Sequence, residues 1–202
     1  IFSRQSLTYL SYMKVVHALD KLILKVLSFK LVVLLAITSG QRCQTLTNLD
    51  IAHEENGEVL FISVQESYVA ESTWTQVTSF YVPRHCEQEL CTYRTLENYP
   101  ERTLPVRAVE HIALLLSYVN PFSPVESSTV GSWIKSLSEQ SGVDTSVFKA
   151  HSARAASASK ANQTVLKDAA LKHIGWSTKS TFSQVLREAF VDIDSFQNAV
   201  LK

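Results

Sequence analysis

A long apolar run near the N-terminus constrains the fold more than any other feature. Residues 22–38 are apolar except at a few positions, which include Lys25 and Lys30. The uncharged stretches are shorter than the roughly 20 residues that a membrane span requires. A helix that is apolar around its whole circumference is buried on all sides. The run therefore predicts a helix from Phe29 to Ile37, capped by Ser28, at the centre of the domain.

The residues on either side of this run also show helical signals. Between Leu7 and Lys30, apolar side chains recur at the spacing of one helix face. After the apolar run, Gly40 marks a break. We expect a short helix to begin near Gln41 and to carry Arg42 in its first turn.

Two β-rich stretches predict a hairpin. Val59 to Val64 and Thr75 to Val82 alternate between apolar and polar residues, with a polar loop between them. Pro83 ends the second strand because proline cannot donate a ladder hydrogen bond. A third short strand can form near Asp50.

The connections further along the chain give weaker signals. Cys86 to Tyr99 fits a short helix or an extended segment, and Pro100 to Pro105 is interpreted as a connection. His111 to Tyr118 is strongly apolar, and its periodicity does not separate strand from helix.

One more helix completes the first three quarters of the chain. We expect it from Thr129 to Ser141, with Ser127 or Ser128 as its cap and Gly142 ending it. About 46% of the 202 residues are apolar, which favours an ordered globular domain. The predicted fold class is α+β, mostly helical, with a small antiparallel hairpin or sheet.

A cluster of long polar side chains among small residues stands out in the C-terminal quarter. His151 and Arg154 are three residues apart, so on a helix they share one face. Their neighbours are alanine and serine, which leave the two long side chains free to reach out. Two arginines and a histidine that converge make a good seat for phosphate, because arginine presents a planar fork of donors and stays charged.

Three motifs occur in order along the chain: Gly40-x-Arg42-x-x-x-Leu46-x-x-Leu49, His151-x-x-Arg154 and Gly175-Trp176. Together they resemble the catalytic domain of tyrosine recombinases, the phage-integrase family. The Gly-Trp motif resembles the eukaryotic mobile-element type, which carries tryptophan where many bacterial members carry histidine. The resemblance runs from about residue 31 to about residue 190.

The resemblance implies chemistry on DNA. Members of the family cleave and rejoin DNA through a 3′-phosphotyrosine intermediate, without metal or cofactor. Arg42, His151, Arg154 and Trp176 would hold the scissile phosphate. The implied partner is DNA, bound weakly to moderately through backbone phosphates, with a possible homo-oligomer on the DNA.

Two positions depart from the family pattern. The resemblance calls for the nucleophilic tyrosine at Leu186, and no tyrosine follows Tyr118. The hairpin from Glu58 to Val82 lacks the lysine that would protonate the leaving oxygen. Gln65 and Glu66 occupy approximately the position of that lysine. Nucleophile and general acid are both missing, so we expect an inactive enzyme.

The charge distribution fits this interpretation modestly. Formal net charge is zero, but ten acidic residues and only two arginines lie between Asp50 and Glu101. Between Val130 and Ser180, seven lysines and arginines lie with three acidic residues. The half with the His-x-x-Arg motif is thus the positive one, which favours a phosphate partner there.

We expect a helical segment at residues 1–30, the recombinase-like domain at 31–190 and a tail at 191–202. The chain begins with Ile1, which suggests a piece of a longer product. Cys43, Cys86 and Cys91 lack metal-site spacing and predict free thiols in an intracellular protein, in the nucleus if it acts on DNA. No signal sequence or membrane segment is evident.

Two alternatives stay open. The chain is an active recombinase if another subunit, or a segment beyond Lys202, supplies the tyrosine. It is a helical protein-interaction module if DNA binding is lost altogether. Individually, Arg42 also fits a structural salt bridge, His151 a helix cap and Trp176 a core aromatic.

Overall fold

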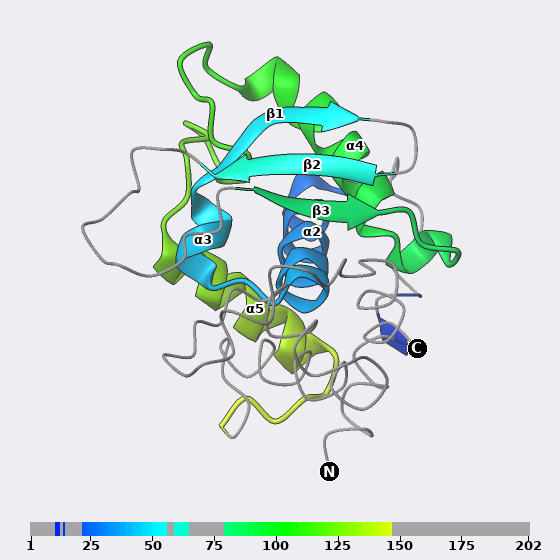
Figure 1. Cartoon of the computed structure of the whole chain (residues 1–202). Coiled ribbons are helices and arrows are strands. Elements are labelled where there is room, and N and C mark those ends of the chain that lie inside the picture. The colour runs from blue at the N-terminus through cyan, green and yellow to red at the C-terminus, as the bar shows by residue number, and fades with distance from the viewer. Residues whose placement is uncertain (1–10, 13, 15–21, 56–58, 65–78, 147–202) are drawn as a thin grey trace, which may run out of the picture.

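The computed structural model describes residues 11, 12, 14, 22–55, 59–64 and 79–146 (Figure 1). Its helices are α2 (Leu24–Ser39), α3 (Cys43–Thr47), α4 (Thr92–Thr103) and α5 (Ser127–Gln140), with short 3₁₀ turns η3 (Gln88–Leu90) and η4 (Leu104–Val106). Its strands are β1 (Leu49–Glu55), β2 (Val59–Val64) and β3 (Ser79–Pro83). The elements bear out the predicted α+β class, mostly helical with one small sheet.

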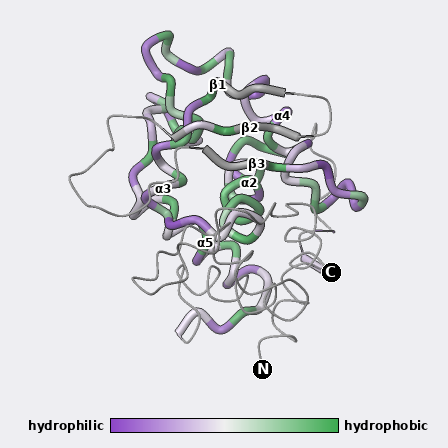
Figure 2. Tube along the Cα trace, viewed as in Figure 1, coloured by the Kyte–Doolittle hydropathy of each residue, from purple (hydrophilic) through white to green (hydrophobic). Residues whose placement is uncertain are grey.

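Helix α2 lies at the centre, as its sequence predicts. Most of its side chains from Leu27 onward are buried, and Leu31 and Leu34 have no exposed surface. Figure 2 shows the helix as a largely hydrophobic tube in the middle of the domain. It packs against both α4 and α5. The interruption expected at Ser28 is wrong, because Ser28 lies inside one continuous helix and its hydroxyl donates to the Leu24 carbonyl at 2.9 Å.

Other buried hydroxyl groups on α2 are satisfied in the same way. Thr38 and Ser39 donate to the carbonyls of Leu34 and Leu35 at 2.7 and 2.6 Å. Each polar side chain thus bonds within its own helix, which removes most of the cost of burying it. Across the described residues, no helix is both long enough and apolar enough to cross a membrane.

Gly40 ends α2 in a left-handed conformation, with φ 62° and ψ 17°. Its N–H donates to the Ala36 carbonyl at 3.1 Å and closes the last turn. This is the break that the sequence predicts, and it turns the chain directly into α3.

The sheet is antiparallel, with strand order β1-β2-β3. In its register, Ile62 faces Phe80 and Leu49 faces Val64. The hairpin is confirmed, and the third strand near Asp50 is longer than the sequence suggests. Figure 1 shows the sheet over α2 and α4, with α5 on the other side of α2.

Helix α4 corrects the interpretation of Pro100 to Pro105 as a plain connection. The helix continues through Pro100 to Thr103 before η4 begins. Tertiary packing outweighs the proline here, because Tyr99 is fully buried and its hydroxyl both donates to the Leu116 carbonyl and accepts from the Leu116 N–H. The Thr103 hydroxyl donates to the Tyr99 carbonyl at 3.0 Å, which further fixes this turn.

The segment that periodicity leaves open, His111 to Tyr118, is extended. It forms isolated bridges from Ala113 to Asp50 and from Leu116 to Pro124. Ile112 is 54% exposed, whereas the next four side chains are buried. The segment is thus exposed at Ile112 and buried beyond it.

Helix α5 starts earlier than predicted. Glu126 is its N-cap residue, without a side-chain cap bond, so neither Ser127 nor Ser128 caps it. The helix ends at Gln140, and Gly142 follows with φ 78°. The predicted apolar face is confirmed, since Trp133, Ile134 and Leu137 are buried.

Of the two predicted domain limits, only the one at residue 30 falls within the described residues. Helix α2 passes without a break through the limit at residue 30, so no structural boundary falls there. The limit near residue 190 lies outside the described residues, and the domain division stays a prediction.

The burial of Lys30 should make the stability of the fold depend on pH in the alkaline range. Its residue is 1% exposed, and burial lowers the pKa of its ammonium from 10.5 to about 8, against an opposing attraction from Glu89. Between about pH 8 and 10.5 the unfolded chain holds a proton that the folded chain has lost. The free energy of unfolding should therefore rise with pH across this window, by up to about 3 kcal/mol.

Urea unfolding from pH 7 to pH 10 measures the slope of the free energy of unfolding against pH. Lys30→Met should reduce this slope. The variant should also be more stable at pH 7, because the buried ammonium is gone. Lys135→Met, at an exposed lysine of α5, is the control and should leave the slope unchanged. Equal slopes for all three proteins would contradict the prediction.

Gly40 gives a second prediction. Alanine in the left-handed region costs roughly 1–2 kcal/mol, and asparagine costs less. Gly40→Ala should therefore lower the free energy of unfolding by about that amount, and Gly40→Asn by clearly less. Chemical denaturation of the two variants tests this; equal losses would show that side-chain crowding, and not φ, governs the site.

Candidate functional site

Of the predicted site residues, only Arg42 lies within the described part of the chain. His151, Arg154, Trp176 and Leu186 lie outside the described residues. Their convergence on Arg42 therefore stays a prediction.

The local structure around Arg42 explains how its side chain is presented. After the left-handed turn at Gly40, Gln41 is buried and its N–H donates to the Ser39 hydroxyl at 3.3 Å. Arg42 is extended, with φ −76° and ψ 151°, and serves as the N-cap residue of α3. The Leu46 N–H donates to the Arg42 carbonyl at 3.0 Å, and the Leu46 side chain is fully buried. The backbone of Arg42 is thus anchored on both sides.

The Arg42 side chain itself is exposed. It forms no hydrogen bond or ion pair with any residue that the structure describes. The salt-bridge interpretation therefore has no support among those residues. A guanidinium in this state keeps its donors available for a ligand such as phosphate.

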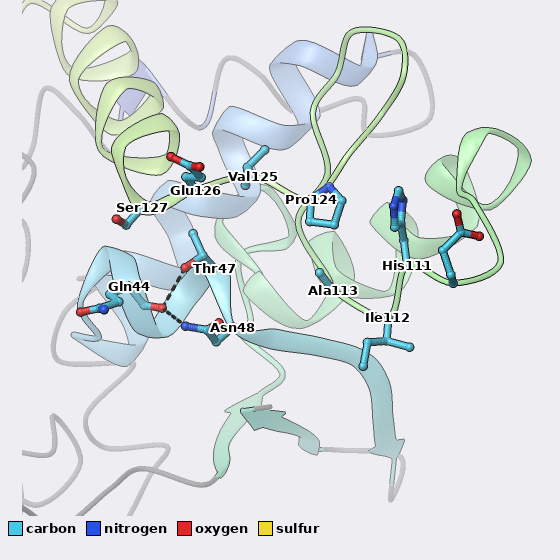
Figure 3. A pocket seen from close by; sticks show the side chains of 11 residues that line it. Gln44, Thr47, Asn48, His111, Ile112, Ala113, Pro124, Val125, Glu126 and Ser127 are labelled. Carbon is cyan, nitrogen blue, oxygen red and sulfur yellow. Dashed lines mark hydrogen bonds between the residues drawn. The ribbon is translucent and has the colours of Figure 1, made fainter. Parts of the chain in front are cut away.

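A shallow pocket of about 500 Å³ lies beside α3. Figure 3 shows residues from three segments around it: the α3 end, the extended segment after η4, and the start of α5. The Thr47 hydroxyl and the Asn48 amide both donate to the Gln44 carbonyl at 2.8 Å, which fixes these side chains. The lining residues are Gln44, Thr47, Asn48, Glu110, His111, Ile112, Ala113, Pro124, Val125, Glu126 and Ser127.

This pocket is not the phosphate seat. Arg42 does not line it, and its formally charged residues are the carboxylates Glu110 and Glu126. An anion would be repelled there. Sequence reasoning missed the pocket because it is assembled from three distant segments, none of which carries a motif.

The four tyrosine side chains that the structure describes are all engaged away from Arg42. Tyr118 packs against Phe29, with ring centroids 5.8 Å apart. Phe29 lies ten residues before the end of α2, or about 15 Å along the helix axis. The Tyr12 hydroxyl donates to Gln140 at 3.1 Å, at the end of α5 remote from α3.

The other two tyrosines are closed off from solvent. Tyr93 and Tyr99 have no exposed surface. The Arg84 guanidinium lies 3.9 Å above the ring of Tyr93, and Tyr99 is bonded to Leu116 as described above. Each of these four side chains thus has a partner other than Arg42.

The cysteines and acidic residues offer no second centre in this part of the chain. Cys43, Cys86 and Cys91 are free thiols, as predicted. Burial raises the pKa of the Cys43 thiol, which disfavours the reactive thiolate. No cluster of histidine, cysteine and carboxylate side chains among the described residues is arranged to hold a metal ion.

No protein-family model and no curated protein sequence matches the chain. Several solved structures, however, are similar to it. The lambda integrase catalytic core is similar with a TM-score of 0.52 and 17% identity, over 85% of this chain and 92% of that chain.

Two larger lambda integrase chains are also similar. A dimer of residues 75-356 bound to a COC′ core site gives a TM-score of 0.51 and 16% identity, over 88% of this chain and 57% of that chain. A further lambda integrase dimer bound to a COC′ core site gives a TM-score of 0.50 and 16% identity, over 91% of this chain and 46% of that chain. The chain spans about half the length of these two proteins. At such low identity the likeness concerns architecture alone, and the chain has the tyrosine-recombinase fold of the lambda integrase catalytic core.

Proposed function

We propose that this chain is a DNA-binding domain of tyrosine-recombinase type that keeps a phosphate seat and lacks its nucleophile. The observation that carries the proposal is Arg42. It is an exposed arginine without a partner among the described residues, held on an anchored turn at the position that the family motif assigns to a phosphate ligand.

The remaining seat residues come from the sequence motifs. Arg154 would supply a second guanidinium, His151 an imidazole donor and Trp176 an indole N–H. Two forked cations on one phosphate give charge-assisted hydrogen bonds without any metal ion. Two of the similar lambda integrase structures are dimers bound to a COC′ core site, which supports DNA and an oligomer as partners here.

The proposal of inactivity rests on two absences in the sequence. A leucine at position 186 has no oxygen to attack phosphorus, and the hairpin has no lysine. The contacts of Tyr12, Tyr93, Tyr99 and Tyr118 add support, because each of these four side chains is engaged with a residue other than Arg42.

The alternatives remain an active recombinase that borrows a tyrosine from another chain or segment, and an interaction module without DNA binding. Each makes a different experimental prediction.

Binding to duplex DNA should fall steeply with salt, because contacts to phosphate release counterions. Arg42→Ala should weaken binding about tenfold or more and reduce the salt slope by about one, with no change in sequence preference. Fluorescence anisotropy of a labelled duplex measures both. Lys135→Ala is the control, since that lysine is already paired with Glu139 at 3.7 Å. No binding at low salt would favour the interaction module.

A double-mutant cycle tests whether Arg42 and Arg154 share a phosphate. If they do, the losses from Arg42→Ala and Arg154→Ala should not add, and the coupling should be about 0.5–3 kcal/mol. Additive losses would mean that the two arginines contact separate phosphates, and the phosphate-seat proposal would fail.

Covalent chemistry is tested with nicked suicide DNA. We expect no slow-migrating protein–DNA band on a denaturing gel from the unaltered chain. Leu186→Tyr should give at most slow adduct formation, because loss of a positioned general acid costs roughly 10²- to 10⁴-fold. A band from the unaltered chain, mapped to one of its tyrosines, would establish the active alternative.

A further inference from the structure

The pocket beside α3 is bordered by an exposed apolar loop. Val109 is fully exposed and Ile112 is 54% exposed, and both belong to the segment that forms one wall of the pocket. On η4, just before them, Leu104 is 69% exposed. Of these three side chains, Ile112 lines the pocket itself, and an exposed apolar side chain at a pocket offers a partner an apolar contact.

One half-buried side chain, Arg107, holds this loop. The Arg107 guanidinium donates to the carbonyls of His111 and Leu114 at 3.1 and 2.9 Å and also to the Ala113 carbonyl. It further donates to the Thr103 hydroxyl at 3.2 Å. Hydrogen bonds from a charged donor are the stronger kind. The backbone on both sides of Ile112 is therefore held in place, and a partner would lose little free energy in ordering it.

The formally charged side chains that line the pocket are all acidic. Glu110, from the loop, and Glu126, at the start of α5, both line the pocket; Figure 3 labels Glu126 beside Ser127. Both are exposed, and neither forms an ion pair with any described residue. Lysine and arginine are absent from the lining. The pocket thus complements a cation and disfavours nucleic acid.

We propose that this pocket binds a peptide segment of a partner protein in which a lysine or arginine neighbours an aliphatic side chain. The cationic group would be attracted by the carboxylates of Glu110 and Glu126. The aliphatic side chain would cover Ile112 and Pro124, and the Gln44 amide would offer a hydrogen bond at the rim. The site is separate from Arg42, and it does not depend on the proposed DNA binding.

The probe is a labelled peptide, acetyl-Gly-Leu-Lys-Leu-Lys-Gly-amide, with a matched peptide that carries glutamate in place of lysine. Anisotropy with the full chain should show binding of the lysine peptide only, weakened by salt. Amide shifts in NMR should map to residues 110–113 and to the start of α5. Arg42→Ala should leave peptide binding unchanged, which separates this site from the DNA site.

Three variants test the contacts. Glu110→Gln and Glu126→Gln should each weaken binding by up to about fivefold, since exposed ion pairs are individually weak. Ile112→Thr keeps a β-branched residue in the extended segment and should weaken binding through loss of apolar contact. Glu101→Gln, at an exposed carboxylate of α4 that does not line the pocket, is the matched control and should have no effect. Unchanged thermal unfolding would confirm that each variant is folded.

Several outcomes would overturn the proposal. Equal binding of the glutamate peptide would remove the role of charge, and unchanged affinity in both glutamine variants would do the same. A dimer in sedimentation that Ile112→Thr dissociates would assign the surface to a second copy of the chain. Shifts of the same amides on adding duplex DNA would assign it to nucleic acid.

Discussion

The burial of α2 is the constraint on which the rest of the structure depends. A helix without a polar face must be covered on every side, so α4, α5 and the sheet all pack around it. The hydroxyls of Ser28, Thr38 and Ser39 donate to carbonyls of the helix itself. Those of Ser28 and Thr38 also contact the hydroxyls of Tyr99 and Thr92 on α4. The end of this helix then fixes where the chain turns at Gly40 and where Arg42 emerges. The presentation of one exposed arginine is thus a direct consequence of the most buried element.

Much of this architecture follows from local sequence signals. The apolar run predicts the central helix, Gly40 predicts its end, and alternation predicts the β2–β3 hairpin. These signals succeed because each depends on residues close together in the chain. The exposure of Arg42 also agrees with its motif, although the motif says nothing about the pocket nearby.

The failures have a common physical cause. The two prolines at 100 and 105 predict a connection, but the buried Tyr99 is hydrogen-bonded to Leu116. This tertiary contact keeps the helix intact through Pro100. Ser28 reads as a cap because serine favours that position, yet packing of the residues on both sides continues the helix through it. The acidic pocket cannot be predicted from local sequence, because its walls come from segments about 70 and 80 residues after the start of α3. Long-range contacts decide all three, and no local pattern records them.

Arg107 has a consequence for the solubility of the fold. The extended segment around Ile112 lies next to β1, with Ile112 and Leu114 bonded to that strand at 2.8 and 2.7 Å. The carbonyls of His111 and Ala113 would otherwise form a bare outer edge, which is a template for pairing with a strand of another molecule. The guanidinium occupies both of them. The two carbonyls are therefore already bonded within the chain, and neither is left bare to accept from a strand of another molecule.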